Sequence, residues 1–162
     1  MIEVSEEIIV KADINKIWAF ITEFSGSLSF NRFHIKLELP PKYSLAKMEK
    51  FIIVHNFGFG NHEMEVKVLE FLPPNRLIIS EECPGDPKKG FPHTSTFNIE
   101  PQEKYCKISY GVQGTFGGKV QDIPFKPILI GVMKEELLKM KKAIESSEVT
   151  LQQLQSETVK TI

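Results

Sequence analysis

The sequence has few cysteines, no long apolar run and no excess of either charge. Cys83 and Cys106 stand outside any CxxC or metal-ligand spacing, so we expect reduced thiols, while a disulfide between them stays open. No stretch approaches the roughly 18 apolar residues of a membrane span. The N-terminus is acidic where a secretion signal is basic and then apolar. These absences predict a cytoplasmic protein without a membrane segment.

Charge and missing motifs exclude further classes. The chain has 20 basic and 21 acidic residues and a formal net charge of −1, which gives no electrostatic reason to expect nucleic-acid binding. It contains no GxSxG nucleophile motif, no GxxxxGK[ST] phosphate loop and no HExxH zinc motif. We therefore predict no cofactor, and no motif assigns an enzyme class.

What the sequence does contain is a long alternating region between two helical ones. Asp13 can cap a helix whose apolar residues recur at helical spacing. That stripe is Ile14, Ile17, Trp18, Ile21 and Phe24. Ser25-Gly26-Ser27 is expected to break the helix, and residues 28–31 to add one turn. Seven strands are predicted by alternation and turn residues, at 3–10, 33–39, 48–57, 62–71, 76–83, 93–100 and 105–116.

A long amphipathic helix is predicted last. Its apolar stripe consists of Phe125, Ile128, Leu129, Val132, Met133, Leu137, Met140 and Ile144. Because proline fits only the first turn of a helix, regular helix is expected to begin between Pro124 and Pro127, with Asp122 as a possible cap. We predict one domain over 1–145, followed over 146–162 by a polar tail or a helix extension.

Three segments carry a family resemblance: "IIVKADINKIWAFITEF", the hairpin "VKVLEFLPPNRLIIS", and "GTFGG" before the last helix. With this order of elements, the chain resembles the START-like superfamily over roughly residues 2–145, the helix-grip fold of birch-allergen-like proteins and polyketide cyclases. The resemblance implies an α+β fold. In it a seven-stranded curved antiparallel sheet wraps around a long C-terminal helix, with two short helices after the first strand. The segment "SGSLSFNRF" departs from relatives that carry tryptophans there, so we expect a cavity entrance of different shape and selectivity.

The resemblance also implies a cavity between the sheet and the last helix, for a small hydrophobic or amphipathic molecule such as a lipid. The residues expected to line it are Met64, Val66, Val68, Ser95, Phe97, Ile108, Tyr110, Phe125, Leu129, Val132, Met133 and Leu137. Considered on their own, most of these apolar residues fit an ordinary packed core better.

Polar residues within the strands are the candidates for chemistry. Glu81 and Glu82 are adjacent, so one faces inward, and burial would disfavour its charge unless a cation pairs with it. That carboxyl is either a general acid or base or, as we expect, a solvated group at the mouth near 84–92. The weak catalytic candidates are Glu82, His93 and Tyr110.

For the other polar residues we predict no functional role. Glu136 is expected at the edge of the apolar stripe of the last helix. His55, His62 and Glu63 make a metal site conceivable, but turn histidines are usually solvated and zinc needs three or four convergent ligands. No metal site is therefore predicted.

Three functions compete for this fold. The first is binding of a small hydrophobic molecule by a monomer or weak homodimer. The alternative is an enzyme of the cyclase, aromatase or dehydratase kind, in which an inward glutamate, Tyr110 and His93 share the proton transfers. The third is a protein-interaction module like relatives that assist chaperones, which would need a large exposed apolar patch. Of these, the sequence favours ligand binding.

Overall fold

The computed structural model describes residues 1–40, 43–45 and 49–159, the side chains of 147–159 excepted. Its seven strands form one antiparallel sheet in the order β1-β7-β6-β5-β4-β3-β2. Their bounds are β1 Ile2–Val10, β2 His34–Glu38, β3 Phe51–Asn56, β4 Asn61–Leu72, β5 Arg76–Glu82, β6 His93–Pro101 and β7 Cys106–Gly114. The predicted α+β helix-grip fold is confirmed, although residue 48 of the strand expected at 48–57 lies outside the described residues.

The first helix is shorter than predicted. α1 spans Ile14–Thr22, and Asp13 caps it by accepting from the Asn15 N–H at 2.8 Å. The break comes at Glu23, so Ser25-Gly26-Ser27 does not interrupt a helix but belongs to α2, Phe24–Ser27. The Glu23 carboxylate caps α2 through the Gly26 N–H, and this bond lets a second short helix start at once. The 3-10 turn η1, Leu28–Phe30, follows as expected.

The last helix, α3, spans Lys119–Val159 and therefore begins before both prolines. The expectation that regular helix starts between Pro124 and Pro127 is wrong. Both prolines lie on the exposed side of α3, where water can serve the backbone carbonyls that lose an N–H partner. Asp122 is not a cap at the start. It lies inside the first turns and accepts from the Phe116 N–H at 2.6 Å and from the N-terminal ammonium at 2.8 Å.

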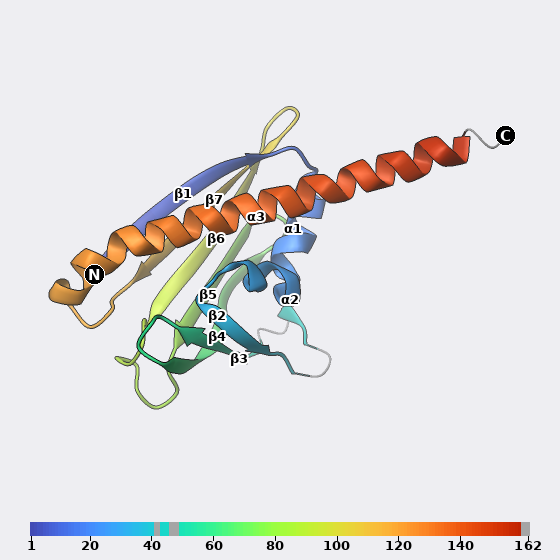
Figure 1. Cartoon of the computed structure of the whole chain (residues 1–162). Helices are drawn as coiled ribbons and strands as arrows, with labels where there is room; N and C mark the ends of the chain where they lie inside the picture. Colours follow the sequence, from blue (N-terminus) through green and yellow to red (C-terminus); the bar gives the residue numbers. More distant parts are fainter. Residues whose placement is uncertain (41–42, 46–48, 160–162) are drawn as a thin grey trace.

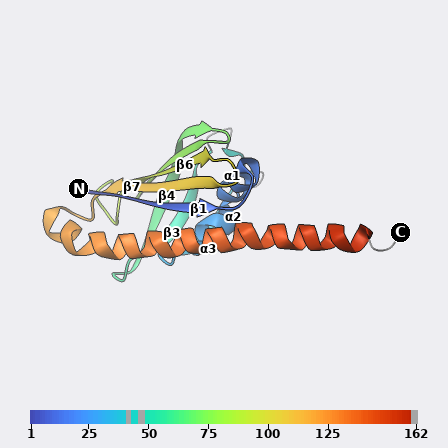
Figure 2. The same ribbon diagram turned by 90° about the horizontal axis from the view of Figure 1, so that it is seen from above.

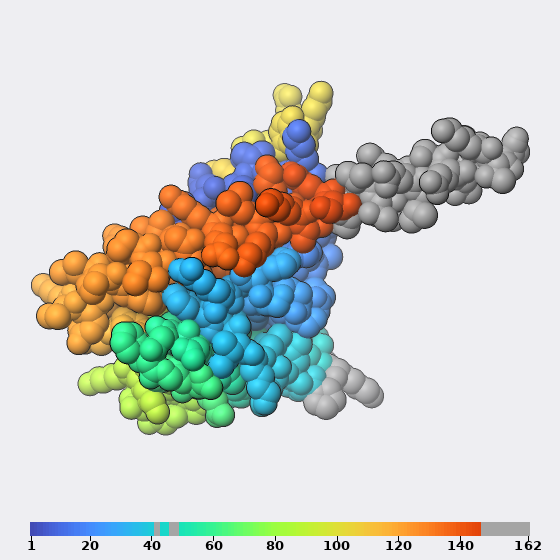
Figure 3. All heavy atoms as spheres, in the orientation of Figure 1, coloured from blue at the N-terminus to red at the C-terminus, as the bar shows by residue number. Residues whose placement is uncertain are grey.

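The helices are arranged on one face of the curved sheet. α3 runs along β1, and α1 and α2 lie between α3 and the far strands of the sheet (Figures 1 and 2). Figure 3 shows the segment that contains α2 and η1 filling the surface between α3 and β2. Among the described residues, none of the helices combines the length and hydropathy that a membrane-spanning segment requires.

The β4–β5 hairpin is held by the residues that carry the family resemblance. Asn75 in the turn accepts from the Ile99 N–H at 2.8 Å, which ties the turn to β6. Arg76 donates to Asn98 at 2.9 Å and pairs with Glu70 at 3.3 Å. These contacts are structural, so the motif fixes the fold and leaves the chemistry to other positions.

Candidate functional site

A group of ionisable side chains lies between the sheet and α3, in an otherwise apolar interior. His55 on β3, Glu81 on β5 and Glu136 on α3 are each no more than 2% exposed. The His93 side chain on β6 is 7% exposed, and His34 on the edge strand β2 is partly buried. Charged side chains are almost never fully buried without a partner, so this group needs an explanation.

Strand alternation places the carboxylate of this group. Glu81 shares the inner face of β5 with Leu77 and Ile79, both buried. Glu82 therefore lies on the outer face, where its side chain is 39% exposed and contacts Lys67. The inward carboxyl is Glu81, and the expectation that it stays solvated at the mouth of the sheet is wrong.

Two histidines hold the Glu81 carboxylate. The His55 Nε2–H donates to Glu81 Oε2 at 2.7 Å, and His93 Nε2 lies 3.5 Å from Glu81 Oε1. Burial alone would raise the pKa of Glu81, but the charges and hydrogen bonds of His93 and His55 hold it well below its ordinary value. The carboxylate is therefore ionised inside the protein.

Backbone carbonyls fix the tautomers of two of the histidines. A carbonyl oxygen can only accept, so His93 Nδ1 donates to Phe91 O at 2.7 Å and His34 Nδ1 donates to Leu28 O at 2.8 Å. Burial alone would lower the pKa of His93, but Glu81 and the Phe91 carbonyl together raise it. Burial and the neighbouring His55 lower the pKa of His34 to about 4. His34 is thus a neutral imidazole with a free Nε2 lone pair.

A second carboxyl, Glu136, behaves in the opposite way. It is buried, not at the edge of the stripe as the sequence predicted, because the loop after η1 covers it. The Asn31 Nδ2–H donates to Glu136 Oε2 at 3.0 Å, while Glu136 Oε1 has no hydrogen-bond partner. Burial raises the pKa of Glu136 to about 8. The interior therefore contains one ionised and one protonated carboxyl.

Tyr110 adds a neutral hydroxyl to the same interior. Its ring stacks on Phe97 with centroids 4.4 Å apart, and its hydroxyl shares a hydrogen bond with Ser95. Burial, and next the charge of Glu136, raise the pKa of Tyr110 well above its ordinary value. The phenol therefore stays protonated and acts only as a hydrogen-bonding group.

Aromatic rings border the histidines. Phe57 stacks on His55 with centroids 5.0 Å apart, and Phe91 stacks on His93 at 4.7 Å. Phe125 from α3 packs on Phe91 at 5.1 Å and joins this wall to the helix. The wall limits water around the histidines and strengthens their electrostatic interactions.

All twelve residues predicted to line a ligand cavity are buried on the inner side of the sheet or on α3. None of them lies in the wall of five cavities found at the surface of the described residues. The cavity that reaches the ionisable group measures about 170 Å³ and lies between η1, β2 and β3, with His34 and Ile53 in its wall. It offers a route from the surface to His34.

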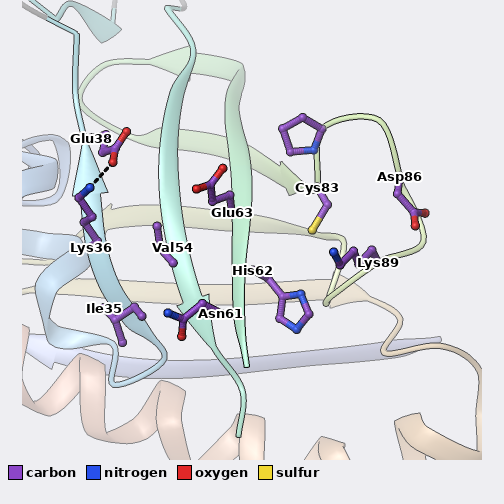
Figure 4. Close-up of a pocket in the computed structure, with 11 residues that line it drawn as sticks. Ile35, Lys36, Glu38, Val54, Asn61, His62, Glu63, Cys83, Asp86 and Lys89 are labelled. Atoms are coloured by element: carbon purple, nitrogen blue, oxygen red, sulfur yellow. Dashed lines mark ion pairs between the residues drawn. The ribbon is translucent and has the colours of Figure 1, made fainter. Parts of the chain in front are cut away.

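A larger groove lies on the outer face of the sheet, over strands β2, β3 and β4. It measures about 800 Å³ and is lined by Lys36, Glu63, Cys83 and Lys89, among others (Figure 4). Charges of both signs alternate along its wall, and the Lys36 and Glu38 side chains pair with each other. Cys83 and Cys106 are both free and buried. The charged side chains in the groove wall are exposed, and the wall contains one buried polar atom without a hydrogen-bond partner among the described residues, His62 Nδ1.

The sequence predicted some members of the interior group and missed others. It selected His93 and Tyr110, left Glu81 open against Glu82, and treated His55 as a solvated turn residue. His34 was not considered. The alternation of β3 could have predicted that His55 is buried, because this histidine shares a face with Phe51 and Ile53.

The structure also changes the grouping of possible metal ligands. Glu63 faces outward, and His62 on β4 pairs with His55 in the β3–β4 register but offers no ligand atom to the group within 4.8 Å. Within the described residues, the side chains that bring three ligand atoms within 4.8 Å of one another are His34, His55 and Glu81. This set differs from the conceivable trio of His55, His62 and Glu63.

Comparison with known proteins identifies the fold alone. No family model matches the sequence, and no curated protein matches it. A conserved protein from Geobacillus kaustophilus superposes with a TM-score of 0.69 at 17% identity, over 90% of this chain and 97% of that one. The di-domain aromatase/cyclase (ARO/CYC) StfQ from the steffimycin biosynthetic pathway superposes with a TM-score of 0.69 at 12% identity, over 90% of this chain and 51% of that one.

A second di-domain ARO/CYC protein, BexL from the BE-7585A biosynthetic pathway, gives a TM-score of 0.64 at 15% identity, over 90% of this chain and 47% of that one. This chain therefore spans about half the length of the two di-domain proteins. The neighbours show that this chain shares its fold with these proteins. At such low identity, function has to be argued from the site.

Proposed function

We propose that this chain binds a small molecule with an apolar body and a polar, hydrogen-bonding end, between its sheet and α3. The observation that carries this proposal is that two of the buried polar atoms without a hydrogen-bond partner, Glu136 Oε1 and His55 Nδ1, belong to the ionisable group between the sheet and α3. Leaving a buried polar atom unpaired costs about 1–3 kcal/mol. A ligand that pairs with both atoms offsets that cost.

The two atoms indicate the chemistry of the ligand's polar end. Glu136 is protonated at neutral pH and its Oε2 accepts from Asn31, so Oε1–H is a donor that needs an acceptor. The His55 Nε2–H donates to Glu81, while His55 Nδ1 has no hydrogen-bond partner, so this nitrogen needs a group that can donate to it or accept from it. A hydroxyl or enol group can supply both functions. The surrounding aromatic rings suit a planar apolar body.

Native mass spectrometry of the freshly purified protein, followed by solvent extraction, tests this proposal. We expect a co-purifying compound that carries a hydroxyl or enol group. Met133→Trp places a large side chain on the buried side of α3. If a ligand occupies the space there, the tryptophan should take its place, so the variant should fold normally while the bound compound is lost. Leu138→Trp is the matched control, because Leu138 is 53% exposed on the same helix.

Two results would contradict ligand binding between the sheet and α3. One is a Met133→Trp variant that loses roughly 1–3 kcal/mol of unfolding free energy in a thermal melt, the effect of overpacking in a filled core. The other is equal retention of the extracted compound by both tryptophan variants.

A second candidate function is acid–base catalysis of the aromatase or cyclase kind at the same site. It is favoured by the two buried carboxyls, because environments that push two carboxyl pKa values apart create an acid and a base. Here Glu136 would protonate a carbonyl oxygen, and His55, paired with Glu81, would accept a proton from carbon. The fold of StfQ and BexL adds support by analogy only.

Cyclisation of a poly-β-ketone, followed by product chromatography, distinguishes this function from passive binding. Glu136→Gln should lower turnover by about 10²–10⁴-fold, the typical contribution of a positioned acid or base, while binding of the substrate persists. Glu135→Gln is the control, since this neighbouring glutamate pairs with Lys139 on the side of α3 exposed to solvent. Equal turnover in the two variants would remove Glu136 as the acid.

A further inference from the structure

Three histidines and one carboxylate converge on the inner face of the sheet, from four different strands. One ligand atom each from His34, His55 and Glu81 lies within 4.8 Å of the others. His93 Nε2 lies 3.5 Å from Glu81 Oε1 on its other side. Imidazole nitrogen and carboxylate oxygen are the ligands that zinc and neighbouring transition metals accept, in sets of three or four.

The hydrogen bonds of the outer nitrogens favour metal ligation over a purely structural role. His34 and His93 each donate Nδ1–H to a backbone carbonyl, of Leu28 and Phe91 respectively. This leaves both Nε2 atoms turned inward. Metal-bound histidines almost always donate their other ring N–H to such a partner, which fixes the tautomer and the ring orientation. The same geometry sets His93 Nε2 beside the Glu81 carboxylate, so a metal ion between the two groups would take the place of the Nε2 proton.

The scaffold and the access route suit a bound ion. The ligands project from paired strands of one sheet, and His34 stands directly opposite His55 in the β2–β3 register. Strand positions hold ligands more rigidly than loops do. The cavity of about 170 Å³ beside His34 gives an entry path and room for a water or substrate atom as a further ligand.

We propose that His34, His55 and Glu81, with His93 as a fourth ligand, bind a divalent first-row transition-metal ion, of which zinc fits this ligand set best. On loading, the His55 proton would move through solvent from Nε2 to Nδ1 and any proton on His93 Nε2 would leave to solvent, so that the hydrogen bond between His55 and Glu81 is replaced by one bond from each to the metal. The ion's charge is partly neutralised by the Glu81 carboxylate. The site does not depend on the small-molecule proposal, because metal alone can occupy it.

Metal binding is tested on the full chain purified without a histidine tag. The probes are Zn²⁺, quantified by elemental mass spectrometry after dialysis, and Co²⁺, followed by its visible absorption. We expect one equivalent per chain. His34→Gln should weaken Co²⁺ binding by more than about 100-fold, since even loss of an outer-shell partner costs 10–100-fold. His34 lies on the edge strand and is partly exposed, so this variant should keep the wild-type circular dichroism spectrum.

His62→Gln is the matched control, because His62 faces His55 across the β3–β4 pair but lies outside the ligand group. It should bind Co²⁺ as the wild type does. The proposal is overturned if wild-type protein takes up less than one equivalent of either metal, if His34→Gln retains full affinity, or if His62→Gln loses it equally. Should His34→Gln unfold, His93→Gln gives the same comparison. Because these titrations use metal alone, their outcome is independent of the extraction experiment on the bound compound.

Discussion

The two ends of the interior are filled in different ways. At the end where β1 meets α1, the space under α3 is filled by apolar side chains that include Val10, Ile17, Met140 and Ile144, each no more than 1% exposed. At the end where β6 begins, the same layer contains histidines and carboxyls. The β6–β7 register separates these ends, since His93 stands opposite Gly114 and Pro101 opposite Cys106.

The apolar end stabilises the fold, whereas the polar end costs stability. Apolar side chains gain free energy from burial whatever their neighbours, at roughly 25 cal/mol for each Å² of apolar surface. Buried charges gain little over a well-packed apolar core and lose much when a partner is missing. A polar end is therefore retained at a cost, which a functional role explains better than a structural one.

Removing the carboxylate from the polar end is the sharpest way to break this comparison. Glu81→Ala leaves His55 and His93 without their buried partner. We expect a loss of about 3–5 kcal/mol in unfolding free energy, the usual result when one member of a buried pair is removed. The measurement is a urea denaturation curve at pH 7 in the presence of a chelator, so that no metal contributes.

The apolar end provides the matched experiment. Met140→Ala removes a fully buried side chain of comparable length, and its cost of about 2–5 kcal/mol comes from lost burial and the cavity left behind. It should leave both Co²⁺ uptake and the co-purifying compound unchanged. If Met140→Ala and Glu81→Ala altered those two readouts alike, the interior would be one undivided core and the comparison would fail.

The helices and strands could be predicted from the sequence because their signals are local, whereas their helix-grip arrangement was implied by the family resemblance. Alternation within each strand, the cap at Asp13 and the turn at Pro73-Pro74 all act over a few residues. The polar site depends on register, which joins positions far apart in the chain. His55 and Glu81 lie on strands separated by β4, and the pairing that brings them together is absent from the local pattern. Parity alone could have placed Glu81 inward, since it follows Leu77 and Ile79.

The start of α3 was predicted wrongly for a different reason: a local rule was applied where the tertiary structure overrides it. Local rules on proline placed its start too late, since they did not include the exposure of Pro124 and Pro127. A helix held by its apolar stripe against the sheet can lose two backbone hydrogen bonds on its solvent side and persist.

Glu136, the second carboxyl of the polar end, should have a smaller effect on the free energy of unfolding, and this effect should depend on pH. The ordinary pKa of a glutamate is 4.5, and burial raises that of Glu136 to about 8 in the folded chain. Between these values the folded chain holds a proton that the unfolded chain has released. The free energy of unfolding should therefore fall as pH rises from 5 to 8, by about 1.4 kcal/mol per pH unit from this group, and level off above pH 8.

Glu136→Gln should remove that fall while keeping the hydrogen bond from Asn31, so the variant becomes the more stable of the two as pH approaches 8. Other groups with shifted pKa values, including His34, Glu81 and His93, contribute equally to both proteins, so the difference between their curves belongs to Glu136. Urea denaturation at half-unit steps of pH measures it, with Glu135→Gln expected to follow the wild-type curve. Parallel curves for wild type and Glu136→Gln would mean that the carboxyl is ionised inside the protein. The acid–base contrast with Glu81 would then be lost, together with the argument for a protonated donor in the site.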